Sequence, residues 1–225
     1  MTDTLDIAAR RDALLAEIRT HASAAGHFPD DIKLVAVSKR QPEARLEAAL
    51  AAGHRVFGEN RVQEAEAHWA ARRASYPDLE LRLIGPLQTN KAAEAVALFD
   101  VIETLDRDRL AAALRKEFDR QGRSPRLYVQ VNTGEEPQKA GVAPAELADF
   151  LVRMRSVYDF GIEGLMCIPP AEQPAGLHFA LLARLAAENG VSGLSMGMSA
   201  DYPVAVGLGA TSVRVGTAFF GPRDT

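Results

Sequence analysis

The amino-acid sequence predicts an α/β fold, a single closed (β/α)8 barrel of the TIM type with an extra N-terminal helix. Three observations support this prediction. Short strand-like runs alternate with helical patterns, no glycine-rich turn follows the first run, and no linker-like stretch divides residues 1–225, which we treat as one domain. Parallel strands need crossover connections, which the helical patterns supply. An open doubly wound sheet is the alternative, but the regular spacing of the runs favours a closed barrel.

The chain begins with apolar residues at helical spacing between Leu5 and Ala25. We therefore expect residues 1–28 to form a lead-in helix that packs on the barrel. The strand-like runs that follow are Lys33–Ser38, Arg55–Phe57, Leu81–Ile84, Val101–Glu103, Leu127–Val131, Ile162–Met166, Gly193–Met196 and Val213–Val215. The helical patterns are a stretch from Pro42 to Gly53 and then Arg61–Arg73, Asn90–Phe99, Arg107–Gln121, Pro144–Val157, Pro174–Asn189 and Tyr202–Leu208. Pro144 and Pro174 mark expected helix starts, and Gly122 and Gly190 mark expected helix ends.

Composition excludes several classes of protein. A formal net charge of −4 argues against non-specific binding to nucleic acid or to an anionic membrane. The chain contains no run of about 18 apolar residues, and its acidic N-terminal residues do not match a signal peptide. The single cysteine, Cys167, forms no intrachain disulfide and suits a reducing compartment. We therefore expect a cytoplasmic protein without nucleic-acid or membrane partners, and the five histidines lack the spacing of a metal site.

Polar groups or glycines follow nearly every strand-like run. In (β/α)8 barrels the active site lies at the C-terminal ends of the strands. The residues in these places are Lys39, Gly58–Asn60, Gly85–Lys91, Glu103–Thr104, Asn132, Met166–Cys167, Ser195–Ser199 and Arg214–Thr217. Loops are polar in any protein, so this pattern indicates where a site would lie without defining its chemistry.

Lys39 directly follows the first strand-like run. Side chains alternate along a strand, so Val35, Val37 and Lys39 share one face. If the two valines fill the barrel, the amine of Lys39 points into its mouth and is partly desolvated. Desolvation favours the neutral amine, which is the nucleophile that forms imines with aldehydes. The alternative is a solvated lysine at the start of a loop, which is the commoner case for an isolated lysine.

Arg214 interrupts the apolar run near the end of the last strand. By the same alternation, Arg214 and Gly216 face the barrel interior, whereas Val213 and Val215 face the surrounding helices. An inward arginine needs a partner. Either the guanidinium donates a hydrogen bond to a ligand atom, or it belongs to an ion pair at the surface.

Two glycine-rich segments, Gly193–Ser199 and Gly216–Thr217, follow the seventh and eighth runs. Glycine lets main-chain N–H groups approach an anion, and hydroxyl groups in these segments add further donors. A helix start near Asp201 would add its dipole. Phosphates in such barrels often bind at the loops after strands seven and eight. The segments thus indicate a phosphate site, although glycine and serine also form ordinary turns.

Seven stretches in order resemble the motifs of one family, the pyridoxal phosphate homeostasis proteins, also called PLP-binding proteins. These stretches are LVAVSK ending at Lys39, FGENRVQE (Phe57–Glu64), IGPLQTNK (Ile84–Lys91), VNTGEEPQKAG (Val131–Gly141), GLMCIP (Gly164–Pro169), LSMGMSADY (Leu194–Tyr202) and RVGTAFFGPR (Arg214–Arg223). They extend from the first strand to the C-terminus. One local departure is Arg82-Leu83, where an aromatic residue or histidine is more usual.

The resemblance implies a fold related to the N-terminal barrel of alanine racemase. It also implies pyridoxal 5'-phosphate (PLP) held as an internal aldimine on Lys39, with Arg214 facing the pyridine nitrogen. The phosphate contacts it implies come from Ser199, Gly216 and Thr217, helped by the main chain of Ser195, Met196, Gly197 and Met198. Asn60, Asn132 and Met166 would line the cofactor pocket.

The expected function is that of a PLP carrier or buffer in vitamin B6 and amino-acid homeostasis, with no strong catalysis. An arginine beside the pyridine nitrogen disfavours its protonation and weakens the ring as an electron sink. Related racemases add a tyrosine from a further β domain, for which this chain, ending at Thr225, has no room. We therefore expect a monomer that delivers PLP to apo-enzymes.

Two alternatives remain open from the sequence. One is a PLP-dependent amino-acid racemase or another small PLP enzyme, and the other is a sugar-phosphate barrel enzyme that uses Lys39 as a Schiff-base lysine without a cofactor. Lys91 and Lys139 lie near the same face of the predicted barrel. They either hold PLP transiently during delivery or are ordinary solvated lysines.

Overall fold

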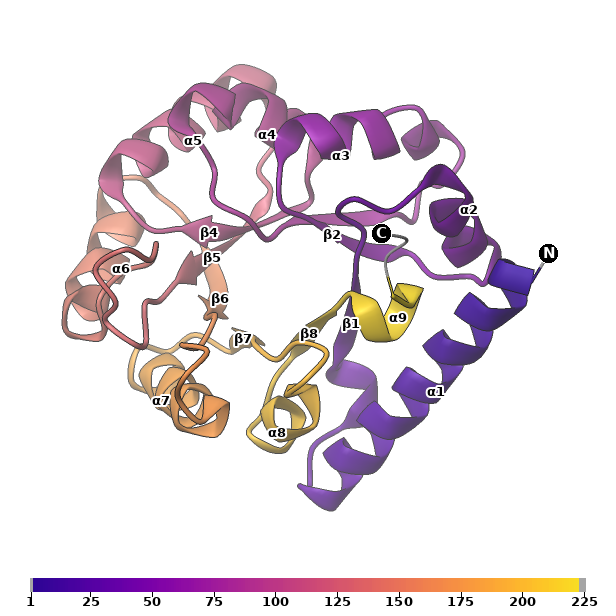
Figure 1. The fold of residues 1–225 in the computed structure, drawn as a ribbon. Coiled ribbons are helices and arrows are strands. Elements are labelled where there is room, and N and C mark those ends of the chain that lie inside the picture. Colours follow the sequence, from indigo (N-terminus) through magenta and orange to yellow (C-terminus); the bar gives the residue numbers. More distant parts are fainter. Residues whose placement is uncertain (1, 223–225) are drawn as a thin grey trace.

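The computed structural model describes residues 2–222 of the chain. Its parallel strands form a closed barrel in sequence order (Figure 1). The strands are β1 (Lys33–Val37), β2 (Val56–Glu59), β3 (Glu80–Leu83), β4 (Val101–Leu105), β5 (Arg126–Gln130), β6 (Ile162–Met166), β7 (Gly193–Ser195) and β8 (Ser212–Val215). The ladder between β1 and β8, in which Lys33 lies beside Ser212, closes the barrel. The predicted closed barrel is thus confirmed, and the open sheet is excluded.

Helices surround the barrel and connect successive strands. The α-helices are α1 (Thr2–Ala24), α2 (Glu43–Ala51), α3 (Val62–Trp69), α4 (Ala92–Leu98), α5 (Asp108–Gln121), α6 (Leu147–Ser156), α7 (Ala175–Glu188), α8 (Tyr202–Gly207) and α9 (Thr217–Phe220). Short 3₁₀ helices cover Pro29–Asp31, Arg72–Ala74, Thr89–Lys91 and Pro144–Glu146. None of the described helices has the length and apolar content needed to cross a membrane.

The observed limits differ from the predicted ones mainly where a 3₁₀ turn replaces a helix end. The helix expected over Arg61–Arg73 ends at Trp69, and the one expected from Pro144 begins with a 3₁₀ turn. Such turns are frequent at helix ends, where hydrogen bonding changes register. Gly122 ends α5 with a left-handed φ of 62°, as its position in the sequence predicts. Helix α9 is absent from the prediction.

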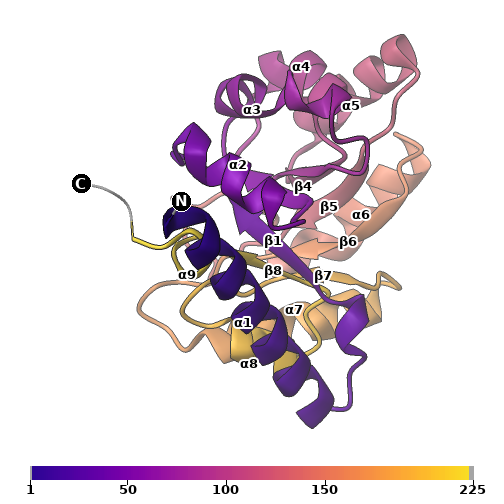
Figure 2. The same cartoon turned by 90° about the vertical axis from the view of Figure 1, so that its right-hand side faces the viewer.

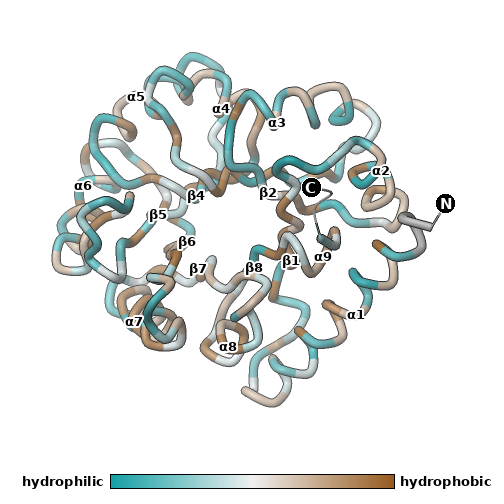
Figure 3. The backbone as a smooth tube through the Cα atoms, viewed as in Figure 1, coloured by the Kyte–Doolittle hydropathy of each residue, from teal (hydrophilic) through white to brown (hydrophobic). Residues whose placement is uncertain are grey.

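Alternate residues of each strand form two different layers. Leu34 and Ala36 of β1 pack with the helices in the main hydrophobic core. Val35 points into the barrel instead, close enough to Gly58 that a Cβ atom there would lie 3.0 Å from the valine. In Figure 3 hydrophobic segments gather on strands such as β1 and β4, and hydrophilic segments prevail on helices α5 and α6. The inward direction predicted for Val35 is therefore confirmed.

Tyr128 fills part of the barrel interior. It forms a small cluster with Val101 and Met166, separate from the helix-facing core. A Cβ atom at Gly164 would lie 2.5 Å from the Tyr128 ring, so the ring needs a glycine on the neighbouring strand. Burial raises the pKa of the Tyr128 hydroxyl to about 12, and this hydroxyl donates a hydrogen bond to Glu163 at 3.0 Å.

Helix α1 packs across the helices nearest the ends of the chain. It contacts α2, α8 and α9 and runs along the outside of the barrel (Figure 2). Its residues Ile7, Leu14, Ile18 and Ala22 are buried and belong to the main core. Helix α1 thus connects the beginning of the barrel to the two short helices that follow β7 and β8.

Candidate functional site

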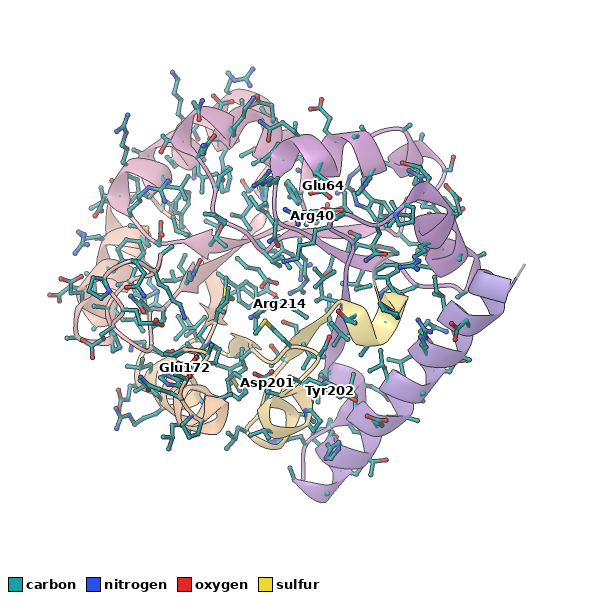
Figure 4. All side chains as sticks on the ribbon, viewed as in Figure 1. Arg40, Glu64, Glu172, Asp201, Tyr202 and Arg214 are labelled. Atoms are coloured by element: carbon teal, nitrogen blue, oxygen red, sulfur yellow. The ribbon has the colours of Figure 1, made fainter. Side chains whose placement is uncertain are left out.

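Lys39 lies in a turn just beyond β1, at the C-terminal end of the barrel. Its half-buried side chain lines a cavity of about 200 Å³ together with Asn60 and Glu64. The next residue, Arg40, has a left-handed φ of 57°, which is uncommon for a residue with a Cβ atom. Its main-chain N–H donates a hydrogen bond to Glu64 of α3, and Figure 4 shows these two residues side by side. The strained turn that carries Lys39 is therefore held by a neighbouring helix.

A buried carboxylate lies behind this turn. Oε1 of Glu59, at the end of β2, accepts hydrogen bonds from Ser38 Oγ at 2.7 Å and Trp69 Nε1 at 3.0 Å. The Nδ1 atom of His68 lies 2.9 Å from the same oxygen, and this hydrogen bond is the main reason that the pKa of His68 is raised. The residue before Lys39 is thus fixed to β2 and α3. The spacing of these residues does not predict the cluster, because three elements contribute to it.

Glu59, Glu64 and His68 also bring potential metal ligands within 4.8 Å of one another. Glu59 and His68 are already hydrogen-bonded to each other, and Glu64 accepts a hydrogen bond from the main-chain N–H of Arg40. Hydrogen bonds thus engage Oε1 of Glu59 and Oε1 of Glu64, whereas Oε2 of Glu59 is buried without a hydrogen-bond partner.

Arg214 projects from β8 into the centre of the barrel, where Figure 4 shows it. Its guanidinium is buried and donates two hydrogen bonds of 2.7 Å, from Nη1 to Ser195 Oγ and from Nη2 to the carbonyl of Cys167. Val213 and Val215 pack into the helix-facing core, as the predicted alternation requires. The partners of Arg214 come from β7 and the end of β6, so three neighbouring strands hold one guanidinium. Burial raises the pKa of the Cys167 thiol to about 12, which makes it a poor nucleophile.

The two predicted phosphate segments meet at one place. The hydroxyl of Ser199 accepts a hydrogen bond of 3.5 Å from the amide of Ala218, which joins the segment after β7 to α9. Gly216 and Thr217 lie at the first turn of α9, where helix geometry leaves N–H groups without intrahelical partners. In the other segment, the amide of Met198 donates to Asp201 Oδ1 at 2.6 Å. The fold thus gathers hydroxyl and N–H donors on one side of the barrel mouth.

The position of Gly197 in this segment requires glycine. Its φ is +89°, and a Cβ atom would lie 2.6 Å from the Cβ of Ala205. The main chain therefore approaches α8 more closely than any other residue type allows. The neighbouring Met196 is buried in the helix-facing core, so only its main chain can face the barrel mouth.

The remaining predicted residues have different surroundings. Asn60 shares the cavity with Lys39, and Met166 lies inside the barrel beside Tyr128. The side chain of Asn132 is occupied within its own loop, where Nδ2 donates to the carbonyl of Glu136 at 2.9 Å and Oδ1 accepts from the amide of Glu136 at 3.3 Å. Asn132 therefore shapes the loop after β5 and presents little of its amide to a ligand.

Both secondary lysines form ion pairs. Lys91 binds Glu94 at 2.8 Å and lines a wider cavity of about 680 Å³, which shares Asn60 with the cavity of Lys39. Lys139 binds Glu136 at 2.5 Å, and its amine lies 3.5 Å from the carbonyl of Pro169. Lys91 thus lies on the same face of the barrel as Lys39.

Comparison with known proteins assigns this arrangement to a family. The family model of the alanine racemase N-terminal domain matches residues 10–224. A pyridoxal phosphate homeostasis protein of Pseudomonas aeruginosa is 41% identical over 218 residues, covering 93% of this chain and 92% of that protein. The chain belongs to the pyridoxal phosphate homeostasis protein family. The member from Escherichia coli K12 is 35% identical over 225 residues, covering 93% of this chain and 95% of its own length.

Solved structures agree with this membership. PipY of Synechococcus elongatus, determined with PLP bound, has a TM-score of 0.81 and 40% identity, with 96% of this chain and 100% of that chain covered. Alanine racemase of Clostridium difficile has a TM-score of 0.69 at 15% identity, and the match covers 94% of this chain but 57% of that enzyme. The homeostasis protein family thus shares its barrel fold with the alanine racemases, as the sequence motifs imply.

The residues of this chain fit PLP by their chemistry. An aldehyde needs an amine, a pyridine ring needs a walled pocket, and a phosphate needs several N–H and O–H donors. Lys39 supplies the amine beside a cavity, and Ser199 together with the first turn of α9 supplies the donors. Arg214 lies buried on the strand that leads into α9.

Proposed function

We propose that this chain binds PLP through an imine between the cofactor's aldehyde carbon and the amine of Lys39. The reaction forms one carbon–nitrogen double bond and releases one water. The observation that carries the proposal is the position of Lys39, half-buried at the end of β1 in a cavity shared with Asn60. PLP in the homologous PipY structure supports this choice of ligand.

Other residues of the barrel mouth would orient the bound molecule. Ser199, Gly216 and Thr217 would bind the phosphate with hydroxyl and N–H groups, helped by the main chain of Ser195–Met198. Arg214 would face the pyridine nitrogen. Asn60 and Met166 would contact the ring, and Asn132 would act through the loop that its side chain holds.

We further propose that the protein acts in PLP homeostasis as a carrier and buffer. The charge of Arg214 disfavours protonation of a nearby pyridine nitrogen, and an unprotonated ring stabilises a carbanion poorly. The two hydrogen bonds that hold Arg214 keep this charge in place. The protein would sequester a reactive aldehyde and release it to apo-enzymes, acting in the cytoplasm as a monomer.

The decisive experiment compares absorption spectra of the chain, with and without added PLP, for the wild type, Lys39→Ala and Lys116→Ala. Lys116 is an exposed lysine on α5 and serves as the matched control. We expect a visible band that borohydride removes in the wild type and Lys116→Ala, and its loss or displacement in Lys39→Ala. Absence of any band in the wild type would contradict PLP binding.

The carrier role has a separate test. The loaded protein is incubated with L- and D-amino acids, and then with the apo form of an unrelated PLP enzyme. We expect transfer of PLP and regain of the second enzyme's activity, without racemisation at ordinary enzymatic rates. Rapid racemisation would replace the carrier with a small PLP-dependent racemase.

A further inference from the structure

Arg82 and Glu103 form a buried ion pair inside the barrel. The exposed fractions of the two side chains are 1% and 0%, and Arg82 Nη1 lies 2.8 Å from Glu103 Oε1. Burial alone would lower the pKa of Arg82, but the charges of Glu103 and Glu80 outweigh it and raise that pKa. The arginine is therefore charged at neutral pH. Because burying two charges costs a large desolvation energy, the pair calls for a role besides stability.

The second carboxylate oxygen of Glu103 is connected to the candidate site through hydrogen bonds. Ser195 Oγ lies 2.5 Å from Glu103 Oε2 and 2.7 Å from Arg214 Nη1. A serine hydroxyl has one proton, and a guanidinium only donates. Ser195 therefore accepts from Arg214 and donates to Glu103. The direction of both hydrogen bonds is fixed, and the row Arg214–Ser195–Glu103–Arg82 runs through β8, β7, β4 and β3.

We infer that Glu103, anchored by Arg82, is a positioning residue that orients Ser195 and, through it, the guanidinium of Arg214. The inference rests on the proposed function, since it needs Arg214 at the pyridine nitrogen. It assigns a role to Arg82, which belongs to the Arg82-Leu83 pair named above as a departure from the motif that the sequence resembles.

The number of acceptor atoms explains why a carboxylate occupies position 103. Arg82 and Ser195 both donate to it, so two acceptor oxygens are required. Glutamine offers one acceptor and one donor group. In Glu103→Gln the amide must point its N–H groups at either Arg82 or Ser195. If they face Ser195, its hydroxyl loses its acceptor and can no longer hold Arg214 in the same orientation.

The opposite side of Arg82 provides a matched control. Its Nε donates to Glu80 Oε1 at 2.7 Å, and Glu80 also binds Lys33 and Arg126, each at 2.7 Å. Glu80→Gln removes a charged partner of the same arginine without touching Ser195. A purely structural role of the ion pair predicts similar effects from Glu80→Gln and Glu103→Gln, whereas a positioning role predicts effects on the cofactor from Glu103→Gln alone.

The experiment measures the absorption maximum of bound PLP, its dependence on pH and the PLP dissociation constant, together with the thermal midpoint of the apo-protein. We expect Glu103→Gln to shift the maximum or its pH midpoint and to weaken binding about tenfold, the effect of one lost hydrogen bond to a charged group. Glu80→Gln should lower the thermal midpoint and leave the spectrum and affinity as in the wild type.

Two further variants keep the test decisive if Glu103→Gln does not fold. Arg82→Leu/Glu103→Leu removes both charges together, and protein interiors often tolerate the replacement of a buried ion pair by apolar residues. Ser195→Ala removes the hydroxyl that links Glu103 to Arg214 and leaves the ion pair between Arg82 and Glu103 intact. Both should change the spectrum as Glu103→Gln does. The inference about Glu103 would be overturned, and the proposed function left standing, by an unchanged PLP spectrum in these variants. An equally large spectral change in Glu80→Gln would have the same consequence. A wild type that shows no PLP band would instead overturn the proposed function on which it rests.

Discussion

The hydroxyl of Tyr202 donates a hydrogen bond to the carboxylate of Glu17, and so ties α1 to the first residue of α8. Tyr202 follows Asp201, which accepts the amide of Met198 in the candidate phosphate segment, and Figure 4 shows both residues at the start of α8. Burial and the neighbouring carboxylate raise the pKa of Tyr202, so the phenol remains protonated. The lead-in helix therefore has a direct contact with the segment after β7.

We predict that Tyr202→Phe lowers the free energy of unfolding by about 1 kcal/mol and weakens PLP binding several-fold. The affinity falls because the segment that holds Ser199 is then less ordered. Tyr158→Phe is the control, since the Tyr158 hydroxyl donates to the carbonyl of Asp108 at 3.3 Å, far from β7 in the chain. Urea unfolding and PLP titration provide the two measurements. Equal affinities for both variants would limit α1 to a packing role.

Gly197→Ala should abolish phosphate binding or unfold the segment after β7. The added Cβ meets Ala205 at 2.6 Å and the Cα of Tyr202 at 3.0 Å, at a residue whose φ of +89° already disfavours alanine. We expect a loss of stability of about 1–3 kcal/mol. Gly207→Ala, at the last residue of the neighbouring helix α8 and with no atom near its added Cβ, should be neutral or slightly stabilising. Wild-type PLP affinity in Gly197→Ala would show that this close approach is unimportant for binding.

Glu80 should make the stability of the barrel sensitive to acid. Burial alone would raise its pKa, but Arg82, Lys33 and Arg126 lower it from 4.5 to about 2. A depressed carboxyl pKa adds stability that is present above the unfolded-state pKa and is lost as pH falls from about 4.5 towards 2. The shift corresponds to roughly 3 kcal/mol.

Urea unfolding of the wild type and Glu80→Gln at neutral pH and at about pH 3 checks this expectation. The difference in unfolding free energy between the two proteins should be large at neutral pH and less than half as large at about pH 3. A difference that stays constant over this range would exclude Glu80 as the source of the acid sensitivity.

Labelling should distinguish the lysines of the barrel mouth. Borohydride reduction with excess PLP, followed by peptide mapping, should label Lys39 first because it lines the cavity of the proposed site at the end of β1. Lys91 and Lys139 form ion pairs with Glu94 and Glu136, respectively. Label at either residue that decreases after transfer to an apo-enzyme would support a transient role. Label at Lys39 alone would discard that hypothesis.

The barrel, its strand order and the inward direction of Val35 and Arg214 were accessible from the sequence, because alternation along a strand is a local property. Helix α9 was not, since Thr217–Phe220 is too short to show a helical period. The sequence also does not predict which side chains pair with each other across the barrel interior. Alternation places Arg82 inside, but which carboxylate meets it depends on the stagger between strands that lie far apart in the chain.

The candidate site likewise has features that the sequence predicts and features that it does not. Candidate residues at strand ends could be predicted because parallel strands bring those ends together. The cluster around Glu59 and the loop contacts of Asn132 depend on side-chain rotamers and on loop closure. Neither leaves a periodic trace in the sequence.

Arg214 is held at Cys167 through a main-chain carbonyl, so the identity of the side chain at position 167 is irrelevant to this contact. We therefore expect replacement of the single cysteine of the chain by alanine to leave this contact in place. In such a cysteine-free variant, a single cysteine introduced on an outer helix would be the one attachment point for a thiol-reactive fluorophore. The proposed transfer of PLP to an acceptor enzyme could then be followed in real time through the change in fluorescence as the bound PLP, which quenches the fluorophore, leaves the barrel.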